Sequence, residues 1–240
     1  IISKSKQIQR QIRSLDKKVK NSIDLSFNRI LKFHLKQKVK NIYYKDKLKN
    51  KLNYKYIPLE SVGIYVPGGT AAYPSTVLMN AIPALIAGVK RIVMVNPACN
   101  GKQNAGVLYA AKKCGVKEIY SIGGAQAIAA LSYGTKKIKK VNKIIGPGNF
   151  YVTAAKKEIF GETGIDMIAG PSEITVVGDK FSNHKWIASD LIAQSEHDEL
   201  SQSIFISKDK NLIYKVKNSL YEQLKKLPRK LIASKSLKNN

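Results

Sequence analysis

The sequence predicts an α/β fold with a mainly parallel sheet, preceded by an N-terminal helical segment. Three observations lead to this prediction. From residue 61 onward, short apolar runs of strand length alternate with helical stretches. The connections between them are short and rich in glycine and proline, which favours parallel strands joined by helical crossovers. Before residue 61 the chain instead repeats apolar residues at three- and four-residue steps among lysines.

The first 55 residues are expected to be helical. Their apolar residues share one helical face, formed by Ile8, Ile12, Leu15, Val19, Ile23, Phe27, Ile30 and Leu31. This stripe needs a partner surface, and we expect it to pack on a domain. A helix lying on a membrane is the alternative, which Asp16 and Asp24 on the polar face disfavour.

The alternating elements follow in order from residue 62. Strands are expected at residues 62–66, 90–95, 118–122, 143–145, 166–168, 174–177 and 203–207. The first helix is expected to hold Pro74 and Ser75 in its first turn and to stop at Gly88, since these are typical boundary residues. The later helices are expected at residues 104–114, 125–133, 151–160, 185–197 and 212–226.

Composition indicates a globular protein and restricts its partners. A chain of 240 residues that is 44% hydrophobic can bury a sizeable core. The formal charge of +26 favours polyanion binding, but only five of the 42 basic residues are arginine, the side chain that reads guanine and phosphate with two parallel hydrogen bonds. We therefore expect weak, non-specific binding of polyanions and no specific nucleic-acid partner.

The location is expected to be the cytoplasm, without membrane contact. No apolar run approaches the length of a membrane span, and no signal-peptide pattern is present. Cys99 and Cys114 match neither a metal nor a redox spacing, and two cysteines do not make a disulfide framework. Because the chain starts with Ile1 and stops in a tail rich in lysine and asparagine, we expect it to be incomplete.

Three glycine-rich turns each follow an expected strand, at residues 68–69, 123–124 and 146–148. In a parallel sheet such turns lie at the carboxyl ends of the strands, where their N–H groups can hold a phosphate. The third turn departs from the dinucleotide fingerprint, because Tyr151 replaces the small third residue and Pro147 lacks an N–H group. Left-handed turns or helix caps explain the glycines equally well.

Polar side chains stand beside these turns. Tyr65, Gln126 and Asn149 each lie at a strand-to-helix junction, where they can offer aromatic contact and amide hydrogen bonds to a nucleotide. Singly, each is more often a turn-stabilising residue, whereas the three on one edge would form a site. Asp166 lies about twenty residues beyond the third turn, the spacing of the acidic residue that binds ribose in a dinucleotide fold.

Gln194 and His197 stand three residues apart at the end of an expected helix, so their side chains can converge on one metal ion. An exposed polar helix face is the alternative. A catalytic zinc usually takes three protein ligands and a water, and no histidine follows His197. The metal site is therefore expected to be incomplete.

Several long motifs resemble the histidinol dehydrogenase family, in the family's order. They are VGIYVPGG at residues 62–69, PSTVLM at 74–79, GGAQAIAAL at 123–131, GPGN at 146–149, DMIAGPSE at 166–173 and ASDLIAQSEHD at 188–198. The resemblance runs from about residue 61 to residue 207, and Phe33, His34 and Gln37 resemble the family's preceding helix. It implies a zinc enzyme that uses two NAD molecules in succession to convert L-histidinol through an aldehyde to L-histidine, the last steps of histidine biosynthesis.

The resemblance also implies roles for residues of this chain. Tyr65, Gln126 and Asn149 match positions that contact NAD. Ser172 matches a substrate contact, and Gln194 and His197 match residues that touch both zinc and histidinol. Zinc would hold the amino alcohol while a hydride leaves for the nicotinamide, and water would add to the aldehyde before the second hydride leaves.

For the fold, the resemblance implies two incomplete Rossmann-like domains and an intertwined homodimer. Residues 65–171 would form the domain that contacts NAD. Residues 172–240 would begin the second domain, and the helical residues 1–64 would pack with it.

The family's catalytic Glu-His pair and its further Asp and His zinc ligands have no match in this sequence. No catalytic residue is therefore assigned, and the chain alone is expected to be inactive. His184 is a weak candidate for the catalytic base. We expect it to be solvated, since no partner that could orient its ring is evident. Two alternatives stay open: a related zinc- and NAD-dependent dehydrogenase of another amino or hydroxy alcohol, and a non-catalytic truncated remnant with a basic surface.

Overall fold

Five parallel strands form the sheet of the first unit, Ile1–Ile168, in the order β5-β4-β3-β6-β7. The structure, a computed structural model, describes residues 5–68, 72–99, 101–168 and 173–239. The strands are β3 (Ser61–Tyr65), β4 (Arg91–Val95), β5 (Glu118–Tyr120), β6 (Lys143–Ile145) and β7 (Gly164–Ile165). The predicted α/β class with a mainly parallel sheet is confirmed. The strand order reverses between β3 and β6, which is where doubly wound sheets bind their ligands.

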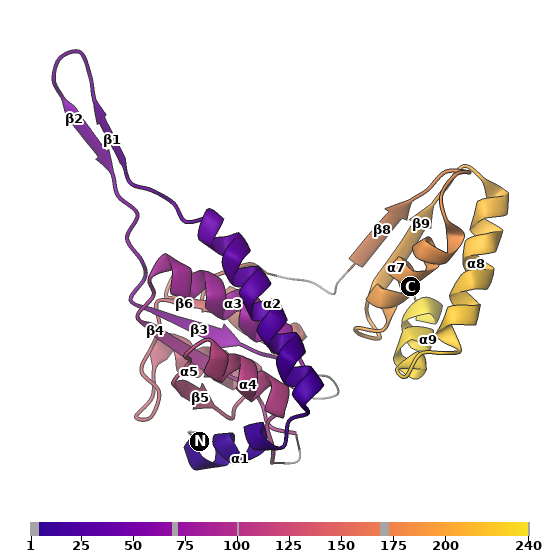
Figure 1. Ribbon diagram of the computed structural model, residues 1–240, viewed down its shortest axis with the longest axis horizontal. Helices are drawn as coiled ribbons and strands as arrows, with labels where there is room; N and C mark the ends of the chain where they lie inside the picture. The colour runs from indigo at the N-terminus through magenta and orange to yellow at the C-terminus, as the bar shows by residue number, and fades with distance from the viewer. Residues whose placement is uncertain (1–4, 69–71, 100, 169–172, 240) are drawn as a thin grey trace. The chain divides into compact units, whose positions relative to one another are not determined.

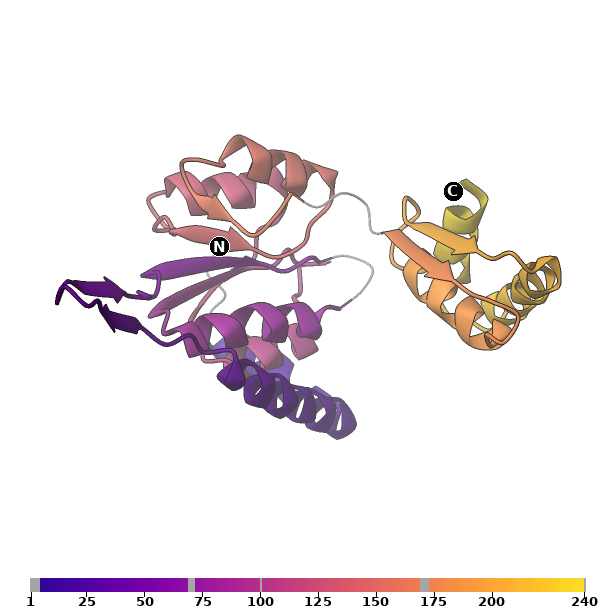
Figure 2. The same ribbon diagram turned by 90° about the horizontal axis from the view of Figure 1, so that it is seen from above.

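Helices cover both faces of this sheet (Figure 2). One face carries α3 (Pro74–Ala87) and α4 (Ala105–Lys113), and the other carries α5 (Gly124–Tyr133) and α6 (Phe150–Glu158). Side chains of each buried strand alternate between the two layers: Ile92 and Met94 of β4 pack with α3 and α4, while Val93 and Val95 pack with α5. Burial on both faces explains why these strands are continuous apolar runs.

The N-terminal helices pack on the outside of α3 and α4. They are α1 (Ser5–Arg13) and α2 (Lys17–Lys36), and Asp16 caps α2 by accepting the N–H groups of Lys18 and Val19. The expected apolar stripe supplies their buried contacts, through Ile12 and Ile23. Packing of residues 1–64 with residues 172–240 stays a prediction.

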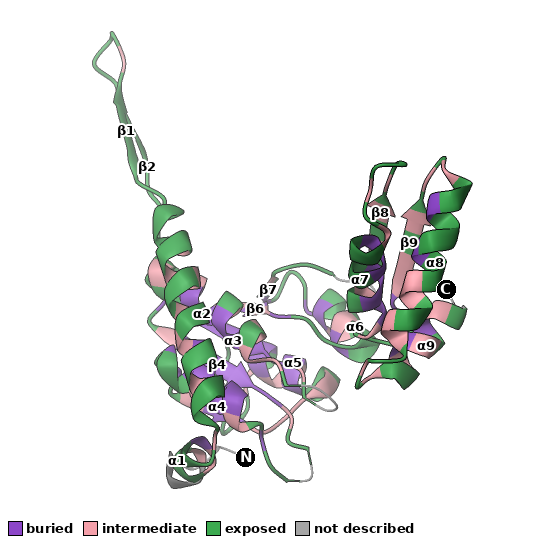
Figure 3. Cartoon of the chain, turned by 45° about the vertical axis from the view of Figure 1, so that its right-hand side comes forward, coloured by how far each residue is buried: buried purple, intermediate pink, exposed green. Residues whose placement is uncertain are grey.

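The expectation of helix as far as residue 55 is wrong beyond α2. Residues 42–54 form an antiparallel hairpin of β1 (Ile42–Lys45) and β2 (Lys51–Tyr54), which projects from the sheet in Figure 1. Both strands are exposed throughout (Figure 3). The Asp46 carboxylate accepts the N–H of Asn50 at 2.8 Å, and Lys49 adopts a left-handed φ of 69°. This turn and the β-favouring Ile and Tyr residues override the helical spacing.

The second unit, Ala169–Asn240, is a βαβ unit followed by two helices. Its parallel strands β8 (Glu173–Val177) and β9 (Gln202–Ile206) are joined by α7 (His184–Ser195) and followed by α8 (Lys210–Leu224) and α9 (Lys230–Asn239). Helix α9 was not expected. Of its residues 230–238, whose burial is described, Ala233 and Ser236 are buried, and this small and polar pair gives no apolar stripe. Among the described helices, none is both long and apolar enough to cross a membrane.

Candidate functional site

Tyr65 ends β3 at the point where the strand order reverses. Its side chain is buried, and its hydroxyl oxygen accepts the backbone N–H of Gly124, the first residue of α5, at 3.0 Å. Burial raises the pKa of the Tyr65 phenol, while the hydrogen bond from Gly124 opposes the shift. The phenol therefore stays protonated at neutral pH and ties the end of β3 to the start of α5.

Gln126 lies in the first turn of α5 and is exposed. Its Oε1 atom comes within 2.7 Å of the point that a Cβ on Gly124 would occupy, and Gly124 has a φ of +71°. The φ of Gly124 favours glycine, and the Gln126 side chain lies in the space that a side chain at residue 124 would take. Its amide thus lies beside the backbone group that Tyr65 holds.

Asn149 lies at the start of α6 and is exposed. Its Oδ1 atom accepts the N–H of Val152 at 3.1 Å, which makes Asn149 the N-cap of the helix. A Cβ on Gly148 would lie only 2.3 Å from Val152, so the turn packs closely on α6. Because Oδ1 accepts a hydrogen bond in the cap, the NH₂ group is the part of the Asn149 amide that the cap does not use, and it can donate to a ligand.

Gly146 brings the third glycine-rich turn against the end of β3. Its φ is +113°, and a Cβ there would lie 2.1 Å from the backbone oxygen of Tyr65. Tyr65 therefore contacts the α5 turn through its hydroxyl group and the 146–149 turn through its backbone. The structure brings Tyr65 together with the turns that carry Gln126 and Asn149, on the carboxyl edge of the sheet.

The Asp166 carboxylate makes its contacts within the protein. Its Oδ2 atom accepts the N–H of Gly146 at 2.8 Å, and its Oδ1 atom contacts the ammonium group of Lys156. The strand expected at residues 166–168 is also displaced, since β7 ends at Ile165 and Asp166 follows it. Lys156 was not singled out from the sequence. Its position in the sequence could have indicated that it is buried, because it lies four residues after Val152 and three before Ile159 and so shares their helical face.

Gln194 and His197 belong to the second unit. Helix α7 ends at Ser195 and Glu196 is its C-cap, so His197 lies in the turn beyond the helix and not within it as expected. The turn is closed by the His197 N–H, which donates to the Gln194 carbonyl at 3.1 Å. The Nε2 atom of Gln194 is buried and has no hydrogen-bond partner among the described residues. Ser172, the expected substrate contact, lies outside the described residues.

The donor set for zinc is incomplete within the described part of the chain. A Gln oxygen and one imidazole supply two ligands, whereas zinc sites use three or four from protein. No group of three or more His, Cys, Asp or Glu side chains that could hold a metal occurs among the described residues. The residues present therefore do not by themselves form a zinc site.

His184 is not the solvated histidine that we expected. Its Nδ1 atom lies 2.7 Å from the hydroxyl oxygen of Ser219, and the pair is partly buried. The contact joins the first turn of α7 to α8, because these two helices pack side by side. His184 is thus a residue of the helix interface.

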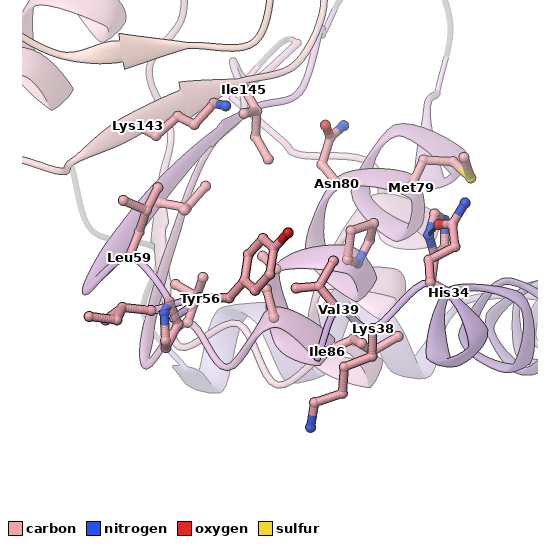
Figure 4. A pocket seen from close by; sticks show the side chains of 18 residues that line it. His34, Lys38, Val39, Tyr56, Leu59, Met79, Asn80, Ile86, Lys143 and Ile145 are labelled. Atoms are coloured by element: carbon pink, nitrogen blue, oxygen red, sulfur yellow. Dashed lines mark hydrogen bonds between the residues drawn. The ribbon is translucent and has the colours of Figure 1, made fainter. Parts of the chain in front are cut away.

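A cavity of about 610 Å³ lies elsewhere in the first unit (Figure 4). It is lined by the end of α2, residues 56–59, α3 and β6, and most of its side chains are apolar. His34 and Gln37 line it and contact each other, with Nδ1 and Oε1 2.6 Å apart. None of Tyr65, Gln126 and Asn149 is among its lining residues, so this cavity is separate from the candidate cofactor site.

Comparison with known proteins decides the family. The family model of histidinol dehydrogenase matches residues 1–240. The chain belongs to the histidinol dehydrogenase family. It is 70% identical over 236 residues to the histidinol dehydrogenase of Pelagibacter ubique, a match that covers 98% of this chain and 55% of that protein. It is 51% identical over 233 residues to the histidinol dehydrogenase of Acinetobacter baylyi, covering 97% of this chain and 54% of that one.

A solved structure of the family agrees. The crystal structure of histidinol dehydrogenase from Elizabethkingia anophelis matches with a TM-score of 0.94 and 40% identity, covering 99% of this chain and 55% of that chain. The resemblance seen in the sequence motifs is therefore confirmed. This chain spans about half the length of the histidinol dehydrogenases that it matches.

Proposed function

We propose that this chain carries the NAD-binding part, and two of the zinc and substrate ligands, of an enzyme that oxidises L-histidinol to L-histidine through histidinal. Family membership supports the reaction and its place in histidine biosynthesis. The observation that carries the cofactor assignment is the pair of contacts made by Tyr65, which joins the two glycine-rich turns where the strand order reverses.

The residues of the chain have distinct roles in this proposal. Tyr65 fixes the two turns, and the exposed amides of Gln126 and Asn149 bind NAD, which when bound supplies the hydride acceptor. Ser172, Gln194 and His197 orient the substrate. None of these residues is assigned as the proton acceptor, so the proposal includes no proton-transfer step.

Zinc is proposed as the metal, with Gln194 and His197 as two of its ligands. This assignment rests on the family motif at residues 188–198. The amide oxygen of Gln194 would be the donor atom, because the Nε2 atom, which has no partner among the described residues, donates hydrogen bonds and does not bind a metal. The chain alone is expected not to retain zinc, since two ligands are too few. Stoichiometric zinc that survives gel filtration would contradict this expectation. From the family we also propose a homodimer in the cytoplasm.

Cofactor binding can be tested without the reaction. Asn149→Ser keeps an oxygen that can cap α6 but removes the amide NH₂ group, so NAD affinity measured by calorimetry should fall about tenfold. Asn104→Ser is the matched control, because Asn104 caps α4 in the same unit. Failure of the unsubstituted chain to bind NAD, or equal losses in both variants, would refute the cofactor assignment.

The reaction itself requires a longer protein. We propose to join this chain to the remaining part of the Pelagibacter ubique enzyme, its 70% identical relative, and to assay histidinol with NAD. Zinc-dependent activity that His197→Ala abolishes is expected, whereas Asn149→Ser should weaken NAD use and leave the zinc content unchanged. Oxidation of only another amino alcohol would favour a related dehydrogenase. No activity together with no NAD binding would favour a non-catalytic remnant.

A further inference from the structure

Lys156 is a buried cation in a mostly apolar layer. It is 4% exposed and lies in α6 between Val152 and Ile159, which belong to the core on that face of the sheet. A lysine is rarely buried unless it is paired, because removing its charge from water is costly. The groups that pair with it therefore indicate why the lysine is there.

Its partners lie on both sides of a single backbone residue. The Lys156 Nζ atom donates to the carbonyl oxygen of Gly146 at 3.0 Å and contacts the Asp166 carboxylate. The other Asp166 oxygen accepts the N–H of Gly146 at 2.8 Å. The lysine and the aspartate thus form a closed ring of contacts around Gly146, holding its N–H and its C=O at once.

Gly146 adopts a conformation in which a side chain has no room. Its φ is +113°, and no Cβ would fit against the backbone of Tyr65. The turn that follows, residues 147–149, leads directly to Asn149 at the start of α6. A rotation of the Gly146 peptide would move Asn149 relative to Tyr65.

We propose that Lys156 and Asp166 are positioning residues of the NAD site, which hold Gly146 so that the Asn149 amide and Tyr65 keep a fixed spacing. This inference rests on the proposed cofactor function. A general stabilising role explains the pair less well, because apolar residues of similar volume often stabilise a core as much as a buried ion pair does. What apolar residues cannot do is hold the N–H and C=O groups of one residue, which belong to two successive peptide groups, in set orientations.

The test compares two ion pairs of the first unit. Lys156→Met removes the clamp while keeping the volume of the side chain. Lys113→Met is the matched control: Lys113 pairs with Asp24 at 2.9 Å and connects α4 to α2, away from the 146–149 turn. NAD affinity is measured by calorimetry at a temperature where each variant is folded. Backbone amide exchange of residues 146–149 is measured on the same samples.

Lys156→Met is expected to weaken NAD binding about tenfold or more and to speed amide exchange in residues 146–149, since small displacements of binding groups are costly. Lys113→Met should leave both unchanged. Should Lys156→Met not fold, Asp166→Asn decides the question, because it keeps an acceptor for the Gly146 N–H but removes the charge that holds Lys156. It should weaken NAD binding by a smaller factor.

The outcomes separate this inference from the proposed function. An unsubstituted chain that does not bind NAD would overturn the proposed function and this inference with it. Binding of NAD by the unsubstituted chain, with the same affinity in the folded Lys156→Met or Asp166→Asn variant, would overturn this inference alone. Equal losses of affinity in Lys156→Met and Lys113→Met would also overturn it, by showing that the loss is not specific to the clamp.

Discussion

Replacing Tyr65 with phenylalanine tests the contact on which the candidate site is built. The substitution keeps the buried ring but removes the hydroxyl oxygen that accepts the Gly124 N–H at 3.0 Å. Gly124 is the first residue of α5, and Gly123 before it makes no side-chain cap. The start of the helix would therefore lose the side-chain acceptor that the structure gives to its first N–H group.

The size of the effect follows from burial. Leaving a buried donor without a partner costs about 1 to 3 kcal/mol. The Tyr65 side chain is buried, but Gly124 is half-buried and water can replace part of the lost bond. We therefore expect Tyr65→Phe to destabilise the start of α5 by about 1 to 2 kcal/mol.

Hydrogen exchange followed by mass spectrometry can localise this loss of stability to α5. A global unfolding curve of a chain with two units cannot do so. Protection of the α5 amides should fall by a factor of about 5 to 30. Tyr133→Phe in the same helix is the control: Tyr133 is 62% exposed, and its protection factors should stay close to those of the unsubstituted chain. Unchanged protection in Tyr65→Phe, or equal loss in the control, would refute the reasoning.

Three further predictions concern other parts of the chain. Burial raises the pKa of the Cys114 thiol to about 12. A thiol reagent should therefore modify the exposed Cys99 in the folded chain and reach Cys114 only on unfolding. Equal rates of modification at the two cysteines would contradict this. Hydrogen bonds from Arg91 lower the pKa of Glu118 from 4.5. The unsubstituted chain should therefore be more stable than Glu118→Gln at neutral pH, and this difference should disappear as acid protonates Glu118. A difference in urea unfolding between the two proteins that does not depend on pH would exclude this cause. His184→Ala should lower the stability of the second unit by about 1 kcal/mol, because it leaves Ser219 without its partner. Unfolding is followed by Trp186 fluorescence. An unchanged unfolding free energy would show that the contact is weak.

Most of the fold could be predicted from periodicity and helix boundaries. Pro74 and Gly88 lie at the two ends of α3 as expected, because the first turn of a helix tolerates proline and a glycine with a left-handed φ ends the last turn. The hairpin of residues 42–54 could not be predicted in this way. Its stability depends on a local turn around Asp46, while its spacing of apolar residues still fits a helix.

For the candidate site, the sequence predicts residues but not their contacts. Motifs predict Tyr65 and Asn149 as cofactor residues, which stays a prediction. The link from the Tyr65 hydroxyl to Gly124 spans 59 residues and leaves no trace in local sequence. The spacing of Asp166 fits a dinucleotide fingerprint that the third turn does not fulfil, and in the fold its carboxylate accepts the Gly146 N–H. Long-range hydrogen bonds of this kind follow from strand order, which local patterns do not specify.

Glycine serves two different purposes in this chain, and the difference separates the site from the scaffold. Gly115 ends α4 with a φ of +70° and has nothing within 4 Å of an added Cβ, so only its backbone conformation favours glycine. Gly146 combines a φ of +113° with a backbone oxygen 2.1 Å from the position of a Cβ, so neither conformation nor space permits a side chain. This close approach of two backbones brings the ends of β3 and β6 together, at the edge that carries Tyr65 and Asn149. The close packing at Gly146 therefore lies at the proposed NAD site, as expected if the spacing of these ligand-binding groups must not vary.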